Sequence, residues 1–171
     1  MYFHIMQKIQ IYESPLGKLT FVSDGLALTG IWFDKQEPLQ QILKAPHEVC
    51  NLPIFDETRL WFDTYFNGQQ PGFIPRLSLI GTTFRQQVWR NLQLIPYGET
   101  TSYGTLAKQI GQQLGKNKMS AQAIGGAVGN NPISIIVPCH RVVGTNGTMT
   151  GYAGGIWRKE FLLDLEAKNR R

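Results

Sequence analysis

The feature that most constrains the fold is a change of pattern and charge near Gly81, which divides this chain of 171 residues into two unlike parts. Residues 1–80 carry 6 Lys and Arg against 8 Asp and Glu, a net charge of −2, whereas residues 81–171 carry 11 against 4, a net charge of +7. A chain of this length holds either one large domain or two small ones. We therefore expect two domains, 1–80 and 81–171.

The first part has the pattern of an antiparallel sheet followed by a helix. Apolar and polar residues alternate over residues 5–12, 18–23 and 26–33, and turn-forming residues separate the three runs, which predicts three strands in a meander. Residues 56–66 place aromatic side chains near helical spacing, and Asn67-Gly68 ends that pattern. These elements indicate a small α+β unit.

The second part has a mainly helical pattern. Residues 83–94, 102–110, 121–128 and 156–167 have helical spacing, and Thr or Ser residues precede the first three of these segments as candidate caps. Gly111 is expected to end the second segment. The second and third segments, joined by a polar turn, suggest a helix-turn-helix. A helix-turn-helix and a net positive charge together suggest a nucleic-acid binder. The alternative is a basic surface that serves only solubility, since it would have the same charge.

The most informative short motif is Pro138-Cys139-His140-Arg141, which follows the apolar run at residues 133–137. Cysteine reacts as the thiolate, and a free thiol is only about 3% ionised at pH 7, so a neighbouring base matters. The apolar run predicts a strand, and Pro138 is expected to end it, because proline lacks the N–H that a sheet needs. We therefore expect Cys139 in a turn, where the His140 side chain can approach the thiol.

A catalytic histidine needs a group that orients its second nitrogen. The acidic candidates in the basic part are Glu99, Glu160, Asp164 and Glu166. On the last helix Phe161, Leu162 and Leu165 are expected to share an apolar face, with Glu166 near its edge. This pattern favours Glu166 only slightly over the others.

Other residue types point to no second site. Cys50 and Cys139 are too few for a disulfide framework, so we expect a reducing, cytoplasmic setting. His4, His47 and Cys50 do not have the spacing of a ligand set, and we expect neither a metal nor a cofactor. Polar residues interrupt the apolar positions of residues 1–11, so we expect no signal peptide and no membrane span.

The order of motifs in the second part resembles the O6-alkylguanine-DNA alkyltransferases, also called methylated-DNA protein-cysteine methyltransferases. The resemblance covers about residues 82–166, and residues 1–80 share only length and layout with that family. It implies an α+β fold, with an N-terminal antiparallel sheet and helix in a ribonuclease H-like layout and a mainly helical C-terminal domain with a helix-turn-helix. The segments that carry it are Ile95-Pro96-Tyr97-Gly98, Ser102-Tyr103, residues 131–144, Gly151-Tyr152-Ala153-Gly154-Gly155 and Lys159-Glu160-Phe161-Leu162-Leu163.

The resemblance implies a role for each reacting residue. Cys139 corresponds to the alkyl acceptor, and His140 corresponds to the base that keeps the thiol ionised through a water. Glu166 corresponds to the carboxylate that orients the histidine. Asn131 corresponds to the asparagine that braces the active-site turn. Tyr103 corresponds to the tyrosine that helps to swing the nucleotide out of the duplex and donates toward guanine N3.

The resemblance also implies a pocket for the flipped base. The carbonyl groups of Cys139 and Val142 would accept hydrogen bonds from the exocyclic amine, and the N–H of Ala153 would donate to O6. Tyr152 and Val128 would line the pocket.

Two residues depart from the family pattern. Gln122 stands where the family usually has an arginine that fills the gap left by the flipped base, which predicts weaker DNA affinity or slower flipping. Ala153 stands where serine is common, and the effect is expected to be mild because the backbone is the donor. Together with Arg141, Gln122 completes the set of residues expected to contact DNA or substrate.

The implied activity is irreversible transfer of an alkyl group from O6-alkylguanine in double-stranded DNA to Cys139, with O4-alkylthymine as a second candidate lesion. The thioether product resists hydrolysis, so each molecule would act once, as a monomer and without a cofactor. Two alternatives are a cysteine-dependent hydrolase, which uses the same residue types, and a non-catalytic lesion-binding or regulatory DNA-binding module. Known lesion-binding relatives of this kind lack the acceptor cysteine.

Overall fold

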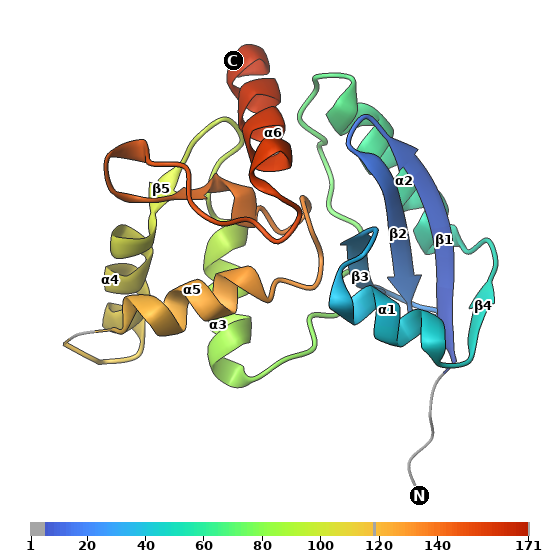
Figure 1. Ribbon diagram of the computed structural model, residues 1–171, viewed down its shortest axis with the longest axis horizontal. Helices are drawn as coiled ribbons and strands as arrows, with labels where there is room; N and C mark the ends of the chain where they lie inside the picture. Colours follow the sequence, from blue (N-terminus) through green and yellow to red (C-terminus); the bar gives the residue numbers. More distant parts are fainter. Residues whose placement is uncertain (1–5, 118, 171) are drawn as a thin grey trace, which may run out of the picture. The chain divides into compact units, whose positions relative to one another are not determined.

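The computed structural model describes residues 6–117 and 119–170, and the chain separates into two units, Met1–Leu79 and Ile80–Arg171 (Figure 1). In the described residues the first unit has a sheet and two α-helices, and the second has four α-helices and a two-stranded sheet of β5 (Thr101–Ser102) and β6 (Val142–Val143). In the residues that the structure describes, no helix has both the length and the apolar composition needed to span a membrane.

A mixed sheet of four strands forms the first unit. Strands β1 (Gln7–Ser14), β2 (Gly17–Ser23) and β3 (Leu28–Phe33) pair antiparallel as expected, and β4 (His47–Val49) adds in parallel to β1. The sequence pattern missed β4 and the preceding helix α1 (Glu37–Lys44), because elements this short show too few positions to define a period. Ile5, the expected start of the first strand, lies outside the described residues.

A helix covers each face of this sheet. Neighbouring residues of a strand point to opposite faces. On one face Val22 of β2 packs in a cluster with Leu39 of α1. On the other face Phe21 of β2 stacks on Phe62 of α2 (Pro53–Phe66), with 5.5 Å between the ring centroids. The first unit therefore has a packed core with aromatic rings at its centre.

Three of the four α-helices described in the second unit begin where the sequence provides caps: the side chains of Thr82, Ser102 and Ser120 each accept a hydrogen bond from a backbone N–H of the first turn. Gly111 does not end its helix as expected. It is buried within the helix, and its carbonyl accepts a hydrogen bond of 2.8 Å from Lys116 N just beyond the helix. The four helices are α3 (Thr83–Gln93), α4 (Tyr103–Gln113), α5 (Ala121–Gly129) and α6 (Ile156–Asn169).

The expected strand at residues 133–137 is wrong, because the chain there folds into tight turns. Ile135 has a φ of 73°, a left-handed conformation that no strand contains. Ile136 N donates to Ser134 O at 2.9 Å, and Val137 N donates to Ile133 O at 3.1 Å. The run is apolar because all of it is buried. Pro138 then leads into a short 3-10 turn, η1 (Cys139–Arg141), so the thiol lies in a turn as expected.

Candidate active site

A cavity of about 570 Å³ in the second unit has Cys139 in its wall. Its other walls come from the start of α4, one side of α5 and the loop at residues 150–154. This volume lies within the range of small-molecule sites, so a single nucleobase fits. Six of the residues expected at the site line the cavity: Tyr103, Val128, Asn131, Cys139, Tyr152 and Ala153.

One side of α5 presents little side-chain bulk to this cavity. Ala121, Gly125 and Gly129 recur at a spacing of four residues and all line it. A methyl group added at Gly125 or Gly129 would meet no atom within 4 Å. The helix backbone is therefore open to a flat group that enters the cavity.

Asn131 holds the turns that lead to the thiol. Its side-chain amide donates to Val137 O at 2.7 Å, and its side-chain carbonyl accepts from Ile133 N at 3.0 Å. Cys139 N donates to the same Val137 carbonyl at 2.8 Å. These bonds compensate for the missing strand and fix the thiol at the cavity wall, where Cys139 is 8% exposed.

His140 is fully buried, and Glu166 fixes its orientation. The Nε2 atom of His140 lies 2.6 Å from Oε2 of Glu166, so Nε2 donates and the Nδ1 lone pair remains available as an acceptor. In the described part of the chain Nδ1 has no hydrogen-bond partner. Burial lowers the pKa of His140, and the hydrogen bond to Glu166 only partly opposes this shift. The imidazole is therefore a neutral base near pH 7.

Glu166 joins several segments of the second unit. Its carboxylate accepts from Arg141 Nε at 2.8 Å and from Gly98 N at 3.1 Å. Gly98 needs its positive φ of 79° for the turn that carries this N–H. Burial alone would raise the pKa of Glu166, but the hydrogen bonds that its carboxylate accepts from His140 and Arg141, together with the positive charge of Arg141, hold that pKa well below the usual range.

The other acidic candidates lie elsewhere. Glu160 and Asp164 are exposed, and Glu99 pairs with Arg170 at 2.9 Å. Of the four carboxylates that the sequence left open, the structure places Glu166 on the histidine.

Arg141 has a different position from the one expected. Its guanidinium bonds to both Glu166 oxygens, donates to Ile95 O at 2.7 Å and lies over the Tyr97 ring. The residue is only 9% exposed, so its charge is used inside the unit and not on a DNA-facing surface.

Lys159 is the functional candidate that the sequence reading missed. It is fully buried, and its Nζ donates to Val142 O at 2.6 Å and to Thr150 O at 3.2 Å. Within the described residues no carboxylate pairs with it. Its spacing of three from Leu162 and seven from Glu166 could have identified it on the buried face of α6.

The buried face of α6 therefore differs from the expected one. Lys159, Leu162 and Glu166 are buried, whereas Phe161 is 38% exposed and Leu165 is half-buried. The Val142 carbonyl, expected to accept from the guanine amine, already receives the Lys159 ammonium.

The thiol of Cys139 is protonated in the free protein. Burial raises its pKa, and the Asn131 hydrogen bond and the Lys159 charge oppose this shift without cancelling it. This differs from the expectation of a thiol kept ionised at rest. A reaction at the sulfur therefore needs a base, and the buried, neutral His140 follows Cys139 directly in the chain.

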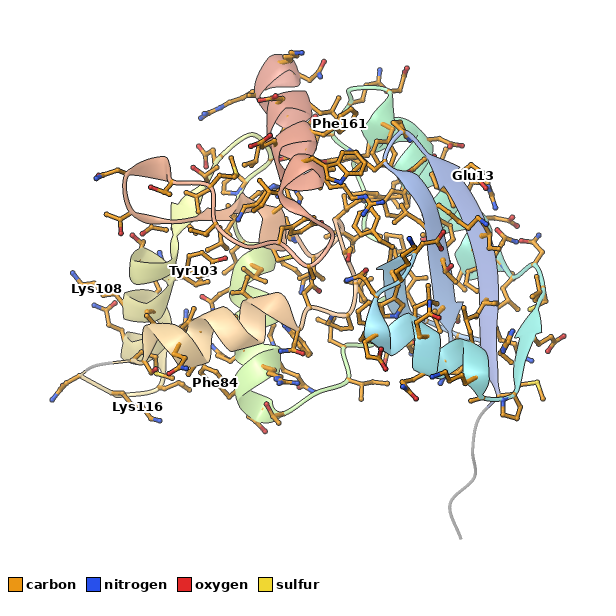
Figure 2. The ribbon with its side chains drawn as sticks, in the orientation of Figure 1. Glu13, Phe84, Tyr103, Lys108, Lys116 and Phe161 are labelled. Atoms are coloured by element: carbon orange, nitrogen blue, oxygen red, sulfur yellow. The ribbon has the colours of Figure 1, made fainter. Side chains whose placement is uncertain are left out.

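Two lysines and one glutamine are exposed on α4, α5 and the connection between them. Figure 2 shows Tyr103 and Lys108 on opposite sides of α4, and Lys116 on the connection to α5. Lys108, Lys116 and Gln122 are exposed. Lys118, between Lys116 and α5 in the chain, lies outside the described residues.

Across residues 6–117 and 119–170, no three His, Cys, Asp or Glu side chains come close enough to hold a metal ion. His4, one of the residues considered for such a site, lies outside this range. Cys50 and Cys139 are free thiols.

Comparisons with known proteins identify relatives over the whole described chain. Two family profiles match, "6-O-methylguanine DNA methyltransferase, DNA binding domain" at residues 83–168 and "6-O-methylguanine DNA methyltransferase, ribonuclease-like domain" at residues 8–77. A methylated-DNA–protein-cysteine methyltransferase of Haemophilus influenzae is 46% identical over 91% of this chain and 83% of its own length. The protein of that name from Mycolicibacterium paratuberculosis is 51% identical over 96% of this chain and 94% of its own.

Solved structures give the same result. The Mycobacterium tuberculosis O6-methylguanine methyltransferase superposes with a TM-score of 0.82 at 41% identity, covering 97% of this chain and 96% of that one. The structure of M. tuberculosis OGT in complex with DNA also has a TM-score of 0.82 at 41% identity, covering 95% of this chain and 94% of that one.

Proposed function

Because the chain belongs to the 6-O-methylguanine DNA methyltransferase family, we propose that it repairs DNA directly by transferring the alkyl group of O6-alkylguanine to Cys139. The observation that carries this proposal is a thiol in the wall of a base-sized cavity, next in sequence to a buried neutral histidine that Glu166 orients. The protein is proposed to have two domains, 1–80 and 81–171. The second contains all the residues to which a role in the reaction is assigned.

The proposed reaction is one displacement at carbon. His140 Nδ1 takes the Cys139 proton through a water, and the sulfur attacks the alkyl carbon. The S–C bond forms as the C–O6 bond breaks, and the electron pair of that bond passes to the guanine ring. The hydroxyl of Tyr103 donates toward N3 as the leaving base gains negative charge, and Glu166 stabilises the imidazolium.

The product explains why the protein would act once. A thioether, unlike a thioester, is not hydrolysed under mild conditions, so Cys139 is not regenerated. The guanine anion that leaves takes up one proton, which balances the proton that Cys139 gave to His140, and guanine is restored without excision of the nucleotide. O4-alkylthymine presents the same chemistry at an exocyclic oxygen and is a second proposed lesion.

The alkylated base must leave the duplex to reach the cavity, and a lesion that pairs poorly is the least costly base to extrude. The α4–α5 pair is proposed to bind the minor groove, and exposed lysines such as Lys108 and Lys116 are proposed to contact phosphates without reading sequence. The DNA complex of the M. tuberculosis relative supports DNA as the partner. We further propose that the protein works as a monomer in the cytoplasm.

Intact-mass measurement after incubation with a duplex oligonucleotide containing O6-methylguanine tests the proposal. We expect a gain of one methyl group per chain at most, and no gain in Cys139→Ser. Turnover of an ester without a mass change would instead support a hydrolase. Lesion binding without a mass change would support a non-catalytic module, and either of these results would reject the proposed repair reaction.

A further inference from the structure

The loop at residues 150–154 forms one wall of the cavity that contains the thiol. Gly151 and Gly154 belong to this loop, and Gly155 follows it. Glycine loses more conformational freedom on ordering than any other residue. Gly155 N donates to Tyr152 O at 2.8 Å, which closes a turn at the end of the loop. A segment so rich in glycine depends on contacts from outside to keep one conformation.

Two side chains of α6 hold the two ends of this loop. Lys159 Nζ donates to Thr150 O at 3.2 Å. At the other end, Arg158 Nη1 donates to Gly154 O at 2.7 Å. A hydrogen bond from a charged donor is about twice as strong as one between neutral groups. The bond from Arg158 is therefore a strong restraint on the end of the loop that leads into α6.

Trp157 restricts the position of the Arg158 side chain. The guanidinium carbon lies 4.6 Å from the centroid of the Trp157 ring. Tryptophan is the aromatic residue that attracts a cation most strongly. Arg158 is also half-buried. Because ring and burial limit the arrangements open to this long side chain, less conformational entropy is lost when it binds the Gly154 carbonyl.

The loop carries the backbone N–H of Ala153, which the family resemblance assigns to guanine O6. Ala153 lines the cavity and is exposed. In the described part of the chain its N–H donates to no backbone carbonyl group, so it is available to a ligand. Gly154 is the next residue along the chain. A contact that fixes the Gly154 carbonyl therefore also restricts the direction of the Ala153 N–H.

We propose that Arg158 is a positioning residue for alkyl transfer, which holds the loop through the Gly154 carbonyl so that the Ala153 N–H meets O6 of the extruded guanine. This inference rests on the proposed function, since it needs a base in the cavity. Arg158 acts through the loop and not on the reacting atoms. Without its hydrogen bond the loop adopts further conformations, and the transfer rate falls with the fraction of molecules whose loop is in place.

Two variants separate the charged donor from the bulk of the side chain. Arg158→Met keeps an apolar stem but has no donor, whereas Arg158→Lys keeps a charged donor. We expect the maximal single-turnover rate, at saturating duplex DNA with O6-methylguanine, to fall about tenfold in Arg158→Met and no more than about threefold in Arg158→Lys. Equal losses in the two variants would overturn the inference, because the donor would then not be what matters.

The DNA concentration that gives half the maximal rate distinguishes positioning from phosphate binding. If Arg158 holds the loop, this concentration should stay within about twofold of wild type in Arg158→Met, with the same salt dependence. An arginine that binds a phosphate would instead weaken DNA binding and reduce its salt dependence. A loss of affinity at an unchanged maximal rate would therefore overturn the inference.

Arg59→Met is the matched control in the first unit. The Arg59 guanidinium carbon lies 5.4 Å from the centroid of the Tyr12 ring, and the side chain donates to Gln10 Oε1. The substitution thus removes the same kinds of contact, away from the cavity. It should lower Tm and leave the maximal rate unchanged when both variants are assayed below their unfolding transitions. An equal rate loss in Arg59→Met would show general destabilisation and overturn the inference.

A free substrate locates the effect at the loop. The free base O6-benzylguanine makes no phosphate contact, so its transfer rate should fall in Arg158→Met by the same factor as with duplex DNA. A loss confined to duplex DNA would overturn the inference. If wild-type protein gains no alkyl group at Cys139, the proposed function itself fails. If wild type reacts and Arg158→Met reacts equally fast, only the role of Arg158 fails.

Discussion

The two units of this chain bury different kinds of side chain. In the described part of the first unit the buried polar side chains are hydroxyls, and the core is built from aromatic rings in contact with one another. In the described part of the second unit five side chains of charged or titratable type are buried, together with three uncharged polar side chains. The five are Cys139, His140, Arg141, Lys159 and Glu166, and the three are Asn91, Asn131 and Ser134.

Because of this difference, substitutions in the two units should have different effects on stability and on the reaction. Packed aromatic rings stabilise a fold and tolerate changes of shape at a moderate cost. Buried charges contribute little net stability, but removing one partner leaves the other unpaired at a high cost. Substitutions in the first unit should therefore change the free energy of unfolding alone, and substitutions in the network of the second unit should change the rate of alkyl transfer as well.

The largest effect is expected for Glu166→Gln. The variant leaves Arg141 without a buried counter-charge and removes the anion that orients His140, so we expect a loss of about 3–5 kcal/mol in unfolding free energy. The transfer rate should fall on the order of 100-fold, because the base is no longer oriented. Denaturant unfolding and single-turnover transfer measure the two effects.

Asp63→Asn is the matched control in the first unit. Asp63 accepts a hydrogen bond of 2.6 Å from Tyr12 at a partly exposed site. Asparagine keeps an acceptor oxygen for Tyr12 but removes the negative charge that strengthens the bond, which should cost about 1 kcal/mol and leave the transfer rate unchanged. Equal rate losses in the two variants would remove the distinction between the units.

Acid unfolding tests the same carboxyl group. Because the pKa of Glu166 is lower in the folded state than its ordinary value of about 4.3, its contribution to stability is present above that pH and lost as the pH falls further. Wild type should thus lose more stability than Glu166→Gln between pH 4 and pH 2. Parallel curves for the two proteins would contradict the assignment of a buried, ionised Glu166.

A smaller, pH-dependent effect is expected for Lys159→Met. The Lys159 charge lowers the pKa of the Cys139 thiol, which burial holds above its ordinary value. Without the cation the thiolate becomes harder to form, so transfer at pH 7 should slow about tenfold, the effect of roughly one pKa unit. The deficit should shrink as the pH rises past 9. A deficit that is independent of pH would show that Lys159 acts only through packing.

Phe62→Leu should affect stability alone. Phe62 contacts the rings of Tyr12, Phe21, Trp61 and Phe66, and leucine keeps most of the volume but none of the ring contacts. We expect a loss of about 1 kcal/mol and an unchanged transfer rate below the unfolding transition. A changed rate would show that the sheet unit takes part in the chemistry. Phe161→Leu, at a partly exposed position of α6, is the control, with a change within about 0.5 kcal/mol.

The smallest effect is expected for Gln122→Arg. Arginine adds charge and a planar group that stacks, so repair of duplex DNA should become about threefold to fivefold faster, which is roughly 1 kcal/mol. Gln122→Lys adds the charge alone and should gain less. Transfer from a free alkylated base should not change. A Gln122→Arg variant that repairs duplex DNA no faster would reject the idea that Gln122 limits flipping.

Local signals predicted much of the fold. Alternation located β1, β2 and β3, and the caps Ser102 and Ser120 located both helices of the α4–α5 pair. Such features depend only on residues close in sequence, so they can be read from the chain. The conformation of residues 133–137 could not be predicted in this way. The run is buried on all sides and therefore apolar throughout, and such a pattern does not distinguish a strand from the turns that Asn131 supports.

Site residues could be predicted where a local motif or spacing defines their position. They could not be predicted where their position depends on burial by segments that are distant in the sequence. The turn at Cys139 followed from Pro138, and the motif placed His140 beside it. The burial of Lys159 did not follow, because lysine is usually solvated and its carbonyl partners, Val142 and Thr150, lie outside its own helix. Arg141 faces inward for the same reason, since its partner Glu166 lies on the last helix.

The burial of Cys139 has a consequence for the life of the molecule before it meets a lesion. A protein that reacts once must keep its sulfur unmodified until then, and it is the thiolate form that attacks disulfides and reacts with oxidants. Burial raises the pKa of the Cys139 thiol and leaves the residue 8% exposed, so these competing reactions should be slow. In the proposed reaction the thiol loses its proton to His140 when an alkylated base occupies the cavity. The same burial that makes the resting thiol a poor nucleophile preserves each copy for its single reaction.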